Sequence, residues 1–407
     1  MRSFTVYLIL ESSASFFFSL IFTVSQLYYV TIVGLTPLQL VLVGTILEAT
    51  VFLFELPTGV LADVKSRRLS IIIGYALMGV GFIVEGSFPL FGMIALAQVL
   101  WGFGYTFTSG ATQAWVADEL GEERAGAAYL RGAQAARVGA LVAIPVSVAL
   151  GTLTVQVPII LGGLLMILLA VFMVFAMKEE GFAPTPPAER TTWGLMLKTV
   201  QDVRRLVHRQ PILLVLLAIG LFYGLYSEGF DRLWTPHLLE SFQTPWGEAA
   251  EPVVWFGLIR VVLLLISLAA TEVARRRVDT NRALPLARSL LLNAVFIVLA
   301  LTGFGLAHNF WLALCLFWLI GALRSVVAPL QAAWLNLNID DPQVRATIFS
   351  VSGQADAIGQ IAGGPAVGAI GNASIRAALV TSALLLSPVV PLYAFAMRRS
   401  GGTKGTP

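Results

Sequence analysis

The sequence predicts an all-α integral membrane protein with about twelve transmembrane helices. Hydrophobic residues make up 57% of its 407 residues and charged residues only 12%, whereas a soluble domain carries roughly 25% charged residues. The mean hydropathy is +0.83. This charge content provides too little polar surface to cover a water-soluble particle, so much of the surface must face lipid. Twelve spans of about 20 apolar residues each fit the chain, with short loops and one long one.

Apolar runs and their breaks divide the spans into two groups of six. The first group is expected near 4–33, 38–60, 69–88, 90–116, 128–151 and 156–177. The second group is expected near 211–236, 252–271, 284–307, 309–333, 346–370 and 375–397. The organisation predicted from them is an N-terminal six-helix bundle over 1–177, a cytoplasmic linker over 178–210, and a C-terminal six-helix bundle with a short cytoplasmic tail over 211–407. Within the linker, Trp193 to Arg209 has apolar and basic residues at helical spacing, which predicts an amphipathic helix on the membrane surface.

The loops differ sharply in lysine and arginine content, which predicts cytoplasmic N- and C-termini. The loops after even-numbered spans and the C-terminal tail hold Lys65, Arg67, Arg68, Arg124, Lys178, Arg190, Lys198, Arg204, Arg205, Arg209, Arg275, Arg276, Arg277, Arg282, Arg345, Arg398, Arg399 and Lys404. The loops near 34–37, 89, 152–155, 237–251, 308 and 371–374 hold none. Compact loops and short tails favour a bacterial inner membrane.

Several chemistries lack the residue patterns they need. The single cysteine, Cys315, cannot form an internal disulfide or a cysteine-based metal site, and His208, His237 and His308 show no metal-ligand spacing. The sequence contains no nucleotide-binding loop of the Gly-x-x-x-x-Gly-Lys-Ser/Thr kind, and no cleavable signal peptide is evident. We therefore expect no catalytic residue, no metal, no cofactor and no nucleic-acid partner.

One decapeptide between spans two and three, Gly59 to Arg68, resembles the loop signature of the major facilitator superfamily, Gly-x-Leu-Ala-Asp-x-x-Gly-Arg-Arg/Lys. Ser66 stands where the family usually has glycine. The resemblance implies the family fold, two six-helix bundles with pseudo-two-fold symmetry, working as a monomer. It also implies a cytoplasmic gate motif that includes Gly59, Asp63, Arg67 and Arg68. We expect Gly59 to allow close helix approach and Asp63 to be the main latch residue; alternatively, the basic residues only enforce topology.

Two other segments resemble family features in part. In span four, Gln98 stands where proton-coupled exporters of the family often have arginine. In span eleven, a run of small residues resembles the antiporter signature. Its members are Gly359, Gly363, Gly364, Pro365, Gly368 and Gly371. Such spacing allows close helix crossing, and the alternative to packing alone is a hinge or a leak barrier.

Charged residues inside apolar spans are costly and are therefore candidates for function. The deepest are Glu48, Arg137, Glu228, Arg260, Arg324 and Asp356, while Glu11, Glu55, Asp231 and Arg232 lie nearer span ends. The family fold implies that spans two and eleven meet, so Glu48 and Asp356 would face each other and one could exchange a proton. The proton-coupling candidates are Glu48, Asp356, Glu228, Asp231 and Glu11. The alternative is that each acid pairs with an arginine, and the spacing of Glu228 and Arg232 predicts such a pair.

The deep arginines and the aromatic residues are candidates for substrate binding. In the family fold, spans five and eight also meet, so Arg137 and Arg260 would face each other and need anionic partners, which an anionic substrate could supply. The substrate-binding candidates are Gln26, Gln113, Arg137, Tyr223, Tyr226, Arg260, Trp318 and Arg324. The alternative for the aromatic residues is packing or contact with lipid.

These features favour a secondary active transporter that exports amphipathic small molecules or drugs in exchange for protons by alternating access. Its expected partners are a small-molecule substrate, protons and membrane lipids. A transporter of an anionic metabolite or lipid that uses the intramembrane arginines is the main alternative. A membrane enzyme or a non-transporting sensor is a more remote one.

Overall fold

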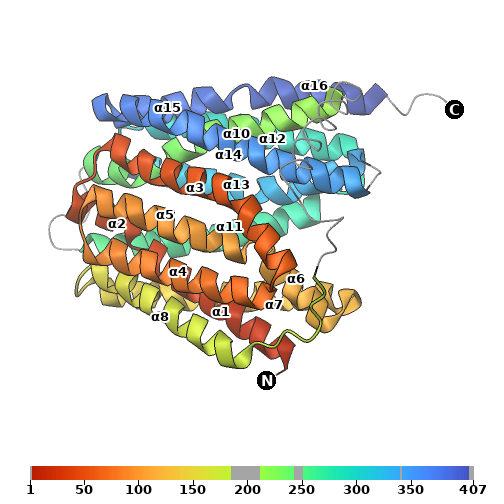
Figure 1. Cartoon of the computed structure of the whole chain (residues 1–407). Coiled ribbons are helices and arrows are strands. Elements are labelled where there is room, and N and C mark those ends of the chain that lie inside the picture. The colour runs from red at the N-terminus through yellow and green to blue at the C-terminus, as the bar shows by residue number, and fades with distance from the viewer. Residues whose placement is uncertain (1, 185–210, 243–250, 340–341, 403–407) are drawn as a thin grey trace. The chain divides into compact units, whose positions relative to one another are not determined.

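A computed structural model describes residues 2–184, 211–242, 251–339 and 342–402, and every regular element within these ranges is helical (Figure 1). The amphipathic helix expected from Trp193 to Arg209 lies outside the described residues. The chain forms two compact units, each described separately below. Unit 1 comprises Met1–Leu35, Ile46–Thr192 and Glu248–Val261, and unit 2 comprises Thr36–Thr45, Trp193–Gly247 and Val262–Pro407.

Two helices, α3 and α11, contribute to both units. Unit 1 contains α1 (Ser3–Phe22), α2 (Ser25–Tyr28), the π-helical turn η1 (Tyr29–Val33), most of α3 (Pro37–Val64), α4 (Arg67–Ser87), α5 (Phe91–Thr108), α6 (Ala111–Leu120), α7 (Glu122–Gly151), α8 (Gln156–Ala176) and the start of α11. Unit 2 contains the start of α3, α10 (Pro211–Glu240), most of α11 (Pro252–Arg277), α12 (Ala283–Leu306), α13 (Phe310–Asn338), α14 (Pro342–Ala373), α15 (Ile375–Leu386) and α16 (Val389–Gly402).

Eleven helical segments of the described residues are long and apolar enough to cross a membrane. Eleven of the twelve expected spans are therefore found. The remaining one, near 346–370, lies in α14, a helix of 32 residues rich in glycine, alanine and polar side chains. Its lower apolarity has a physical reason, because small residues suit a helix that packs closely on its neighbours.

Most helices extend beyond the apolar run that predicted them. Helix α7 begins at Glu122 rather than near 128, α10 continues to Glu240 rather than 236, and α11 continues to Arg277 rather than 271. The apolar run marks only the part of a helix that lies in hydrocarbon, whereas polar residues can continue the helix into the interface.

Span four is interrupted rather than continuous. Helix α5 ends at Thr108 and α6 begins at Ala111, with Gly110 between them at φ +73°. Gly121, at φ +83°, then joins α6 to α7. Glycine adopts this left-handed region readily, which explains both breaks.

The two units repeat the same pattern of helix pairing. In unit 1, α1 packs on α7 and α8, and α4 lies between α5 and α8 (Figure 1). In unit 2, α10 packs on α14 and α15, and α12 packs on α13, α15 and α16. Span one packs on spans five and six, and span seven packs in the same way on spans eleven and twelve. Span three packs on spans four and six, and span nine packs in the same way on spans ten and twelve. The fold of one half is therefore repeated in the pairing of the other.

The glycine run of span eleven packs on two helices within unit 2. On one side, Gly359 and Gly363 lie against α10, where main-chain atoms occupy the space that a side chain would need. On the other side, Gly364, Gly368 and Gly371 lie against the start of α3. The packing interpretation of the run is thus confirmed, and spans two and eleven meet here as expected.

The corresponding contact in unit 1 joins the end of α7 to the start of α11. A Cβ on Gly151 of α7 would meet Val253 of α11. A Cβ on Gly257 of α11 would meet Val148 of α7. The expected meeting of spans five and eight is therefore also found, at this end of the two helices.

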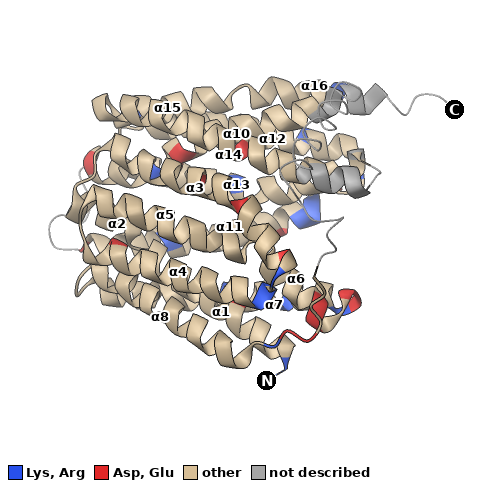
Figure 2. Cartoon of the chain, viewed as in Figure 1, with Lys and Arg blue, Asp and Glu red and all other residues tan. Residues whose placement is uncertain are grey.

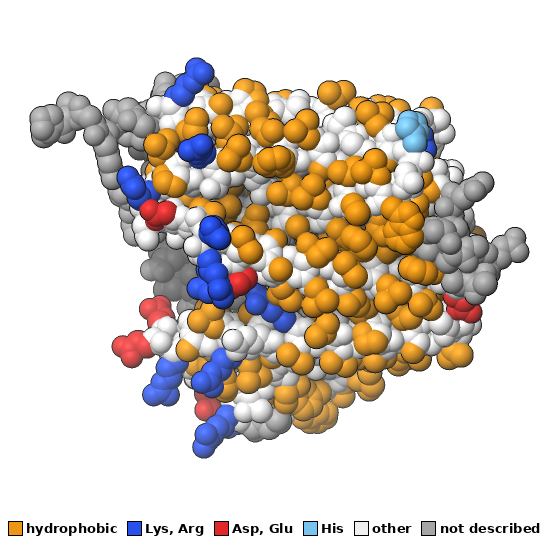
Figure 3. All heavy atoms as spheres, turned by 180° about the vertical axis from the view of Figure 1, so that it is seen from behind, with side chains coloured by type: hydrophobic (Ala, Val, Ile, Leu, Met, Phe, Trp, Pro, Cys, Tyr) orange, Lys and Arg blue, Asp and Glu red, His pale blue; other side chains and the backbone are white. Residues whose placement is uncertain are grey.

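Hydrophobic side chains cover much of the visible face of the molecule (Figure 3). Exposed examples include Phe175, which is 84% exposed, and Leu130 and Leu153, each 72% exposed. A surface of this kind suits contact with lipid tails rather than with water.

Replacing Gly363 by alanine is expected to destabilise the fold. The new Cβ would overlap the main chain of Leu225, so α10 and α14 would have to separate, at a cost of about 1–3 kcal/mol. Thermal unfolding of the detergent-solubilised protein measures this. Gly353→Ala in the same helix is the matched control, because no atom that the structure describes lies within 4 Å of its added Cβ. Equal melting temperatures for the two variants would contradict the packing account.

Candidate functional site

The loop between α3 and α4 is organised around Arg67 rather than Asp63. Arg67 forms an ion pair with Asp118 at the end of α6, and its guanidinium also lies over the ring of Phe182, 5.8 Å from the centroid. Asp63 contributes a longer contact of 3.9 Å to Arg67, and its side chain is 53% exposed. Acidic and basic residues gather where α6 and α7 meet (Figure 2). Arg67, the first residue of α4, therefore links span three to span four within unit 1.

Ser66 explains why this chain tolerates the loss of the usual glycine. Its hydroxyl accepts a hydrogen bond from the main-chain N–H of Leu69 at 2.9 Å, which caps α4. The same hydroxyl donates to Glu179 Oε2 at 2.6 Å, and the main-chain N–H of Arg68 donates to Glu179 Oε1 at 2.9 Å. The segment after α8 is thereby tied to the start of α4.

The expected close helix approach at Gly59 is not found within the described part of unit 1. No atom of the residues described in unit 1 lies within 4 Å of the position that a Cβ on Gly59 would occupy. The reason is that Gly59 lies on a part of α3 with open space beside it, so no neighbouring backbone requires a small residue there.

A second polar cluster lies in unit 2, between the middle parts of α10 and α13. Arg324 Nη2 donates to Asp231 Oδ2 at 2.8 Å, and Nη1 donates to Oδ1, so the pair is bidentate. The same guanidinium lies 5.6 Å from the ring centroid of Tyr226 and 5.2 Å from that of Phe230. A guanidinium that is both paired and stacked has a fixed position.

Aromatic rings continue this cluster along α10 and α13. Tyr223 and Tyr226 pack edge to face, with centroids 5.9 Å apart. Trp234 stacks on Phe317 with centroids 4.5 Å apart, and Phe230 stacks on the same ring at 6.0 Å. Packing between the two helices thus accounts for much of this aromatic content.

Glu228 pairs with Arg232 on the same helix, as their spacing predicts. Arg232 Nε donates to Glu228 Oε2 at 3.2 Å, and the side chains are 17% and 6% exposed, respectively. The carboxylate lies against the backbone of α3 at Gly44, where any side chain would overlap it. Glycine at this position lets α3 approach a buried ion pair.

Asp356 differs from the other acids of unit 2. Its Oδ2 accepts a hydrogen bond from Gln360 Nε2 at 2.8 Å. Among the residues that the structure describes, it forms no ion pair. Its main-chain carbonyl lies against Gly224, and it is near enough to Arg324 and Asp231 for their charges to act on it. Asp356 is therefore an acid beside a paired cluster rather than a member of it.

The remaining expected acids are distributed over unit 1. Glu48 lies in unit 1 and Asp356 in unit 2, so their expected pairing stays a prediction. Glu11 is half-buried in α1 and makes no ion pair with any residue in the described ranges.

Two of the expected substrate-binding amides, both in unit 1, differ in exposure. Gln26 is half-buried, and its Oε1 accepts no hydrogen bond from the described part of the chain. Gln113 is exposed, and its main-chain carbonyl accepts a hydrogen bond from the Tyr129 hydroxyl at 2.8 Å. The binding role expected for both amides stays a prediction.

Arg137 and Arg260 also belong to unit 1. Arg137 is exposed near the middle of α7, where water or a ligand is a more favourable neighbour than hydrocarbon. Arg260 is half-buried, and within the described residues its Nε donates no hydrogen bond and its guanidinium forms no ion pair. Trp318, another expected substrate-binding residue, is half-buried and precedes Arg324 on α13.

A buried network that the sequence did not reveal joins α4, α5 and η1 in unit 1. Glu85 is 1% exposed and Gln98 is 2% exposed. Trp101 Nε1 donates to Gln98 Oε1 at 2.8 Å, which directs the amide nitrogen of Gln98 to Glu85 Oε2 at 3.1 Å and to the Tyr29 hydroxyl at 3.4 Å. Glu85 lies near the end of its span, where an acid normally reaches water, so its burial has no signal in the sequence.

Comparisons with known proteins agree with this arrangement. A sequence model of the Major Facilitator Superfamily matches residues 7–363. An uncharacterized MFS-type transporter of Bacillus subtilis (strain 168), YxaM, is 22% identical over 366 residues, covering 87% of this chain and 86% of that protein.

Two solved transporters have a similar fold. The nucleoside transporter NupG has a TM-score of 0.76 at 13% identity, covering 99% of this chain and 100% of its own. An inward-facing bacterial homolog of the human lysosomal transporter Spinster has a TM-score of 0.73 at 13% identity, covering 100% and 98%. At these identities the likeness concerns the fold alone.

Replacing Arg67 by glutamine is expected to destabilise unit 1 more than Asp63→Asn does. The first change removes the partner of Asp118 and costs about 1–3 kcal/mol, whereas the exposed Asp63 contact contributes about 0–1 kcal/mol. Melting temperatures of the two variants measure this order. A larger loss for Asp63→Asn would contradict this order of the two contacts.

A double-mutant cycle of Asp231→Asn and Arg324→Gln is expected to give a coupling energy of about 1–2 kcal/mol. This is less than the 3–5 kcal/mol typical of breaking a fully buried pair, because the Asp231 side chain is 43% exposed. Chemical unfolding in detergent provides the four stabilities. The matched control is the exposed pair Glu272–Arg275, for which the coupling is expected to be clearly smaller because water screens both charges. Equal couplings for the two pairs would contradict a special role for Arg324.

Proposed function

The chain belongs to the Major Facilitator Superfamily and is a membrane transporter of that type, and we propose that it exports amphipathic small molecules in exchange for protons. The observation that carries this proposal is the difference between the acids of unit 2. Asp231 and Glu228 are held by arginines, whereas Asp356, on the adjacent α14, has only the Gln360 amide as its hydrogen-bond donor among the described residues.

Proton binding has different consequences for the paired and the unpaired acids. Protonating Asp231 or Glu228 would break an ion pair and leave an arginine charge uncompensated inside the membrane, which is strongly unfavourable. Protonating Asp356 breaks no ion pair. Of these three acids, Asp356 is therefore the one that can bind and release a proton at low cost, and we assign it the coupling role.

Competition between a proton and the substrate at Asp356 would couple proton movement to substrate movement. The ionised carboxylate attracts a cationic or strongly polar substrate, and a bound proton removes that attraction, so proton and substrate would exclude each other. Tyr223 and Tyr226 provide aromatic surface on α10, next to the helix that carries Asp356. Alternating access would follow from rocking of two six-helix halves about a central site.

The protein is a multi-pass membrane protein, and we propose a bacterial inner membrane with both termini in the cytoplasm. The support is the lysine and arginine content of the loops after even-numbered spans. The family resemblance supports a monomer as the working unit.

An anionic substrate is the second candidate, and Arg260 is the observation that favours it. A guanidinium cannot release its proton, so a half-buried one without an ion-pair partner among the described residues is suited to bind a carboxylate or phosphate. On this alternative, Arg260 binds the substrate and Asp356 is not required for its recognition.

Substrate-driven proton movement in liposomes tests the two candidates together. The purified protein is exposed to a lipophilic cation (tetraphenylphosphonium), a neutral nucleoside (uridine) and an organic anion (benzoate), with a pH-sensitive dye inside. Uridine is included because NupG, which shares the fold, is a nucleoside transporter. The proposal predicts proton flux with the cation or the nucleoside.

Asp356→Asn is expected to abolish this proton flux, because an amide cannot carry the proton. The matched control is Asp279→Asn, an exposed acid in the loop between α11 and α12, which should leave the flux unchanged. Flux that survives Asp356→Asn would contradict the coupling role. Movement of benzoate alone, lost in Arg260→Gln, would replace the export proposal by the anionic one.

A further inference from the structure

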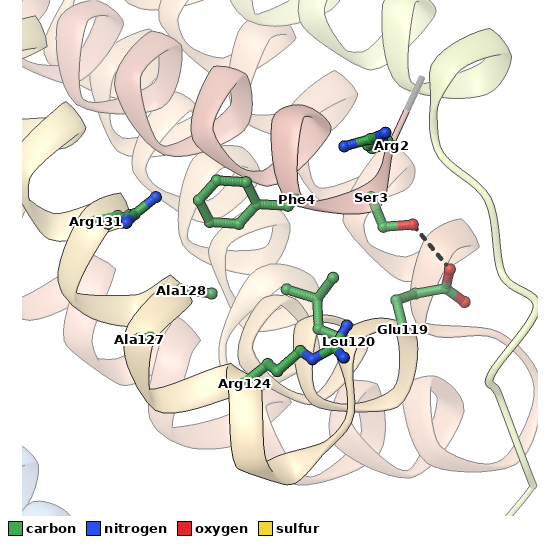
Figure 4. Close-up of a pocket in the computed structure, with 9 residues that line it drawn as sticks. All are labelled: Arg2, Ser3, Phe4, Glu119, Leu120, Arg124, Ala127, Ala128 and Arg131. Carbon is green, nitrogen blue, oxygen red and sulfur yellow. Dashed lines mark hydrogen bonds between the residues drawn. The ribbon is translucent and has the colours of Figure 1, made fainter.

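A hollow of about 450 Å³ lies in unit 1 between the start of α1, the end of α6 and the first turns of α7 (Figure 4). Its wall on α7 consists of Arg124, Ala127, Ala128 and Arg131. Residues three, four and seven positions apart lie on one face of a helix, so this wall follows from the sequence of α7. The two alanines leave the space that longer side chains would fill.

Basic side chains dominate the rim of this hollow. Arg2, Arg124 and Arg131 line it together with one acid, Glu119. Within the described ranges, none of the three arginines forms an ion pair. Arg131 lies 5.8 Å from the ring centroid of Phe4, on the wall formed by α1.

The acid at the rim already has hydrogen-bond partners of its own. Glu119 Oε2 accepts from the Ser3 hydroxyl at 3.0 Å, and Oε1 accepts from the main-chain N–H groups of Glu180 and Gly181 at 2.6 and 2.8 Å. Its carboxylate is therefore occupied in holding α1, α6 and the segment after α8 together. The hollow presents three guanidinium groups against this single engaged acid, which favours an anion.

The position of the hollow places it at the membrane boundary. Two candidate spans, Ser3–Val33 and Phe91–Leu120, begin or end at its lining residues, and a third, Glu122–Gly151, begins just before the lining residue Arg124. Phe4, Leu120 and the two alanines give it apolar walls, and Leu130, next to Arg131, is 72% exposed. A site with a basic rim and apolar walls at this level matches a phospholipid, whose phosphate adjoins its first methylene groups.

We propose that this hollow binds the headgroup of an anionic phospholipid. Arg124 and Arg131 contact the phosphate from α7, and Arg2 adds its charge from α1. The glycerol and the first methylenes lie against Phe4, Leu120 and Ala127. Arginine suits this task because its planar fork binds phosphate oxygens in pairs. Lipid bound here would join α1, α6 and α7 at the end where Arg67 joins α4 to α6.

Native mass spectrometry of the full chain, titrated with phosphatidylglycerol or with phosphatidylcholine of the same acyl chains, tests the proposal. The wild type is expected to bind phosphatidylglycerol preferentially. The double variant Arg124→Gln/Arg131→Gln is expected to weaken that binding about thirtyfold. Each arginine near a lipid surface strengthens binding by about a factor of five, and the two factors multiply.

Three comparisons decide the outcome. Arg277→Gln/Arg282→Gln removes the same charge from exposed arginines on α11 and its following loop and should leave the lipid preference intact. Ala127→Leu fills the hollow while keeping every charge, so it should weaken lipid binding even if the arginine variant does not fold. Inorganic phosphate and glycerol 3-phosphate, added as competitors, should not displace the lipid at comparable concentration.

The proposal is overturned by any of three results. The control variant could lose as much binding as the pocket variant, which would indicate attraction to the whole basic surface. Both pocket variants could retain wild-type affinity, which would place the lipid elsewhere. Inorganic phosphate could compete equally with the lipid, which would make the hollow a site for a soluble anion.

Discussion

The ion pair between Asp231 and Arg324 is the constraint on which the rest of unit 2 depends. An arginine cannot become neutral at reasonable cost, so its position inside a span requires an anionic partner or water. Asp231 supplies that partner in bidentate geometry, and the rings of Tyr226 and Phe230 cover the guanidinium. With Arg324 fixed in this way, α10 and α13 are joined by both charge and aromatic packing.

Small residues determine which acids come near this pair. Gly224, Gly359 and Gly363 allow α10 and α14 to pack backbone to backbone, and that contact brings the helix carrying Asp356 to the face of α10 beside Asp231. Gly44 likewise lets α3 approach Glu228. Packing geometry and charge pairing therefore act together: the glycines bring the helices close, and the arginines then neutralise two of the three acids. Asp356, the third acid, accepts a hydrogen bond from the neutral Gln360 amide instead, so it suits the proposed coupling role.

The sequence predicted the spans well because each needs only a local property, a run of apolar residues of sufficient length. It also predicted the Glu228–Arg232 pair, since both residues lie on one turn of one helix. It did not predict the partners of Arg67, because Asp118 and Glu179 are distant in sequence and only the folded chain brings them together. Gly59 illustrates the opposite case, in which a family motif suggested a close contact that is not found among the residues described in unit 1. The buried Glu85 was missed because its depth depends on neighbours from α5 and η1.

The central claim, that Asp356 exchanges the coupling proton while Asp231 and Glu228 are held in ion pairs, can be measured without knowing the substrate. Infrared difference spectroscopy of the purified protein in lipid, recorded across a pH titration, detects the C=O stretch of any carboxyl group that gains a proton. The account predicts a titrating carboxyl band that disappears in Asp356→Asn and persists in Asp279→Asn. An unchanged band in Asp356→Asn would contradict it and would assign the proton to another acid.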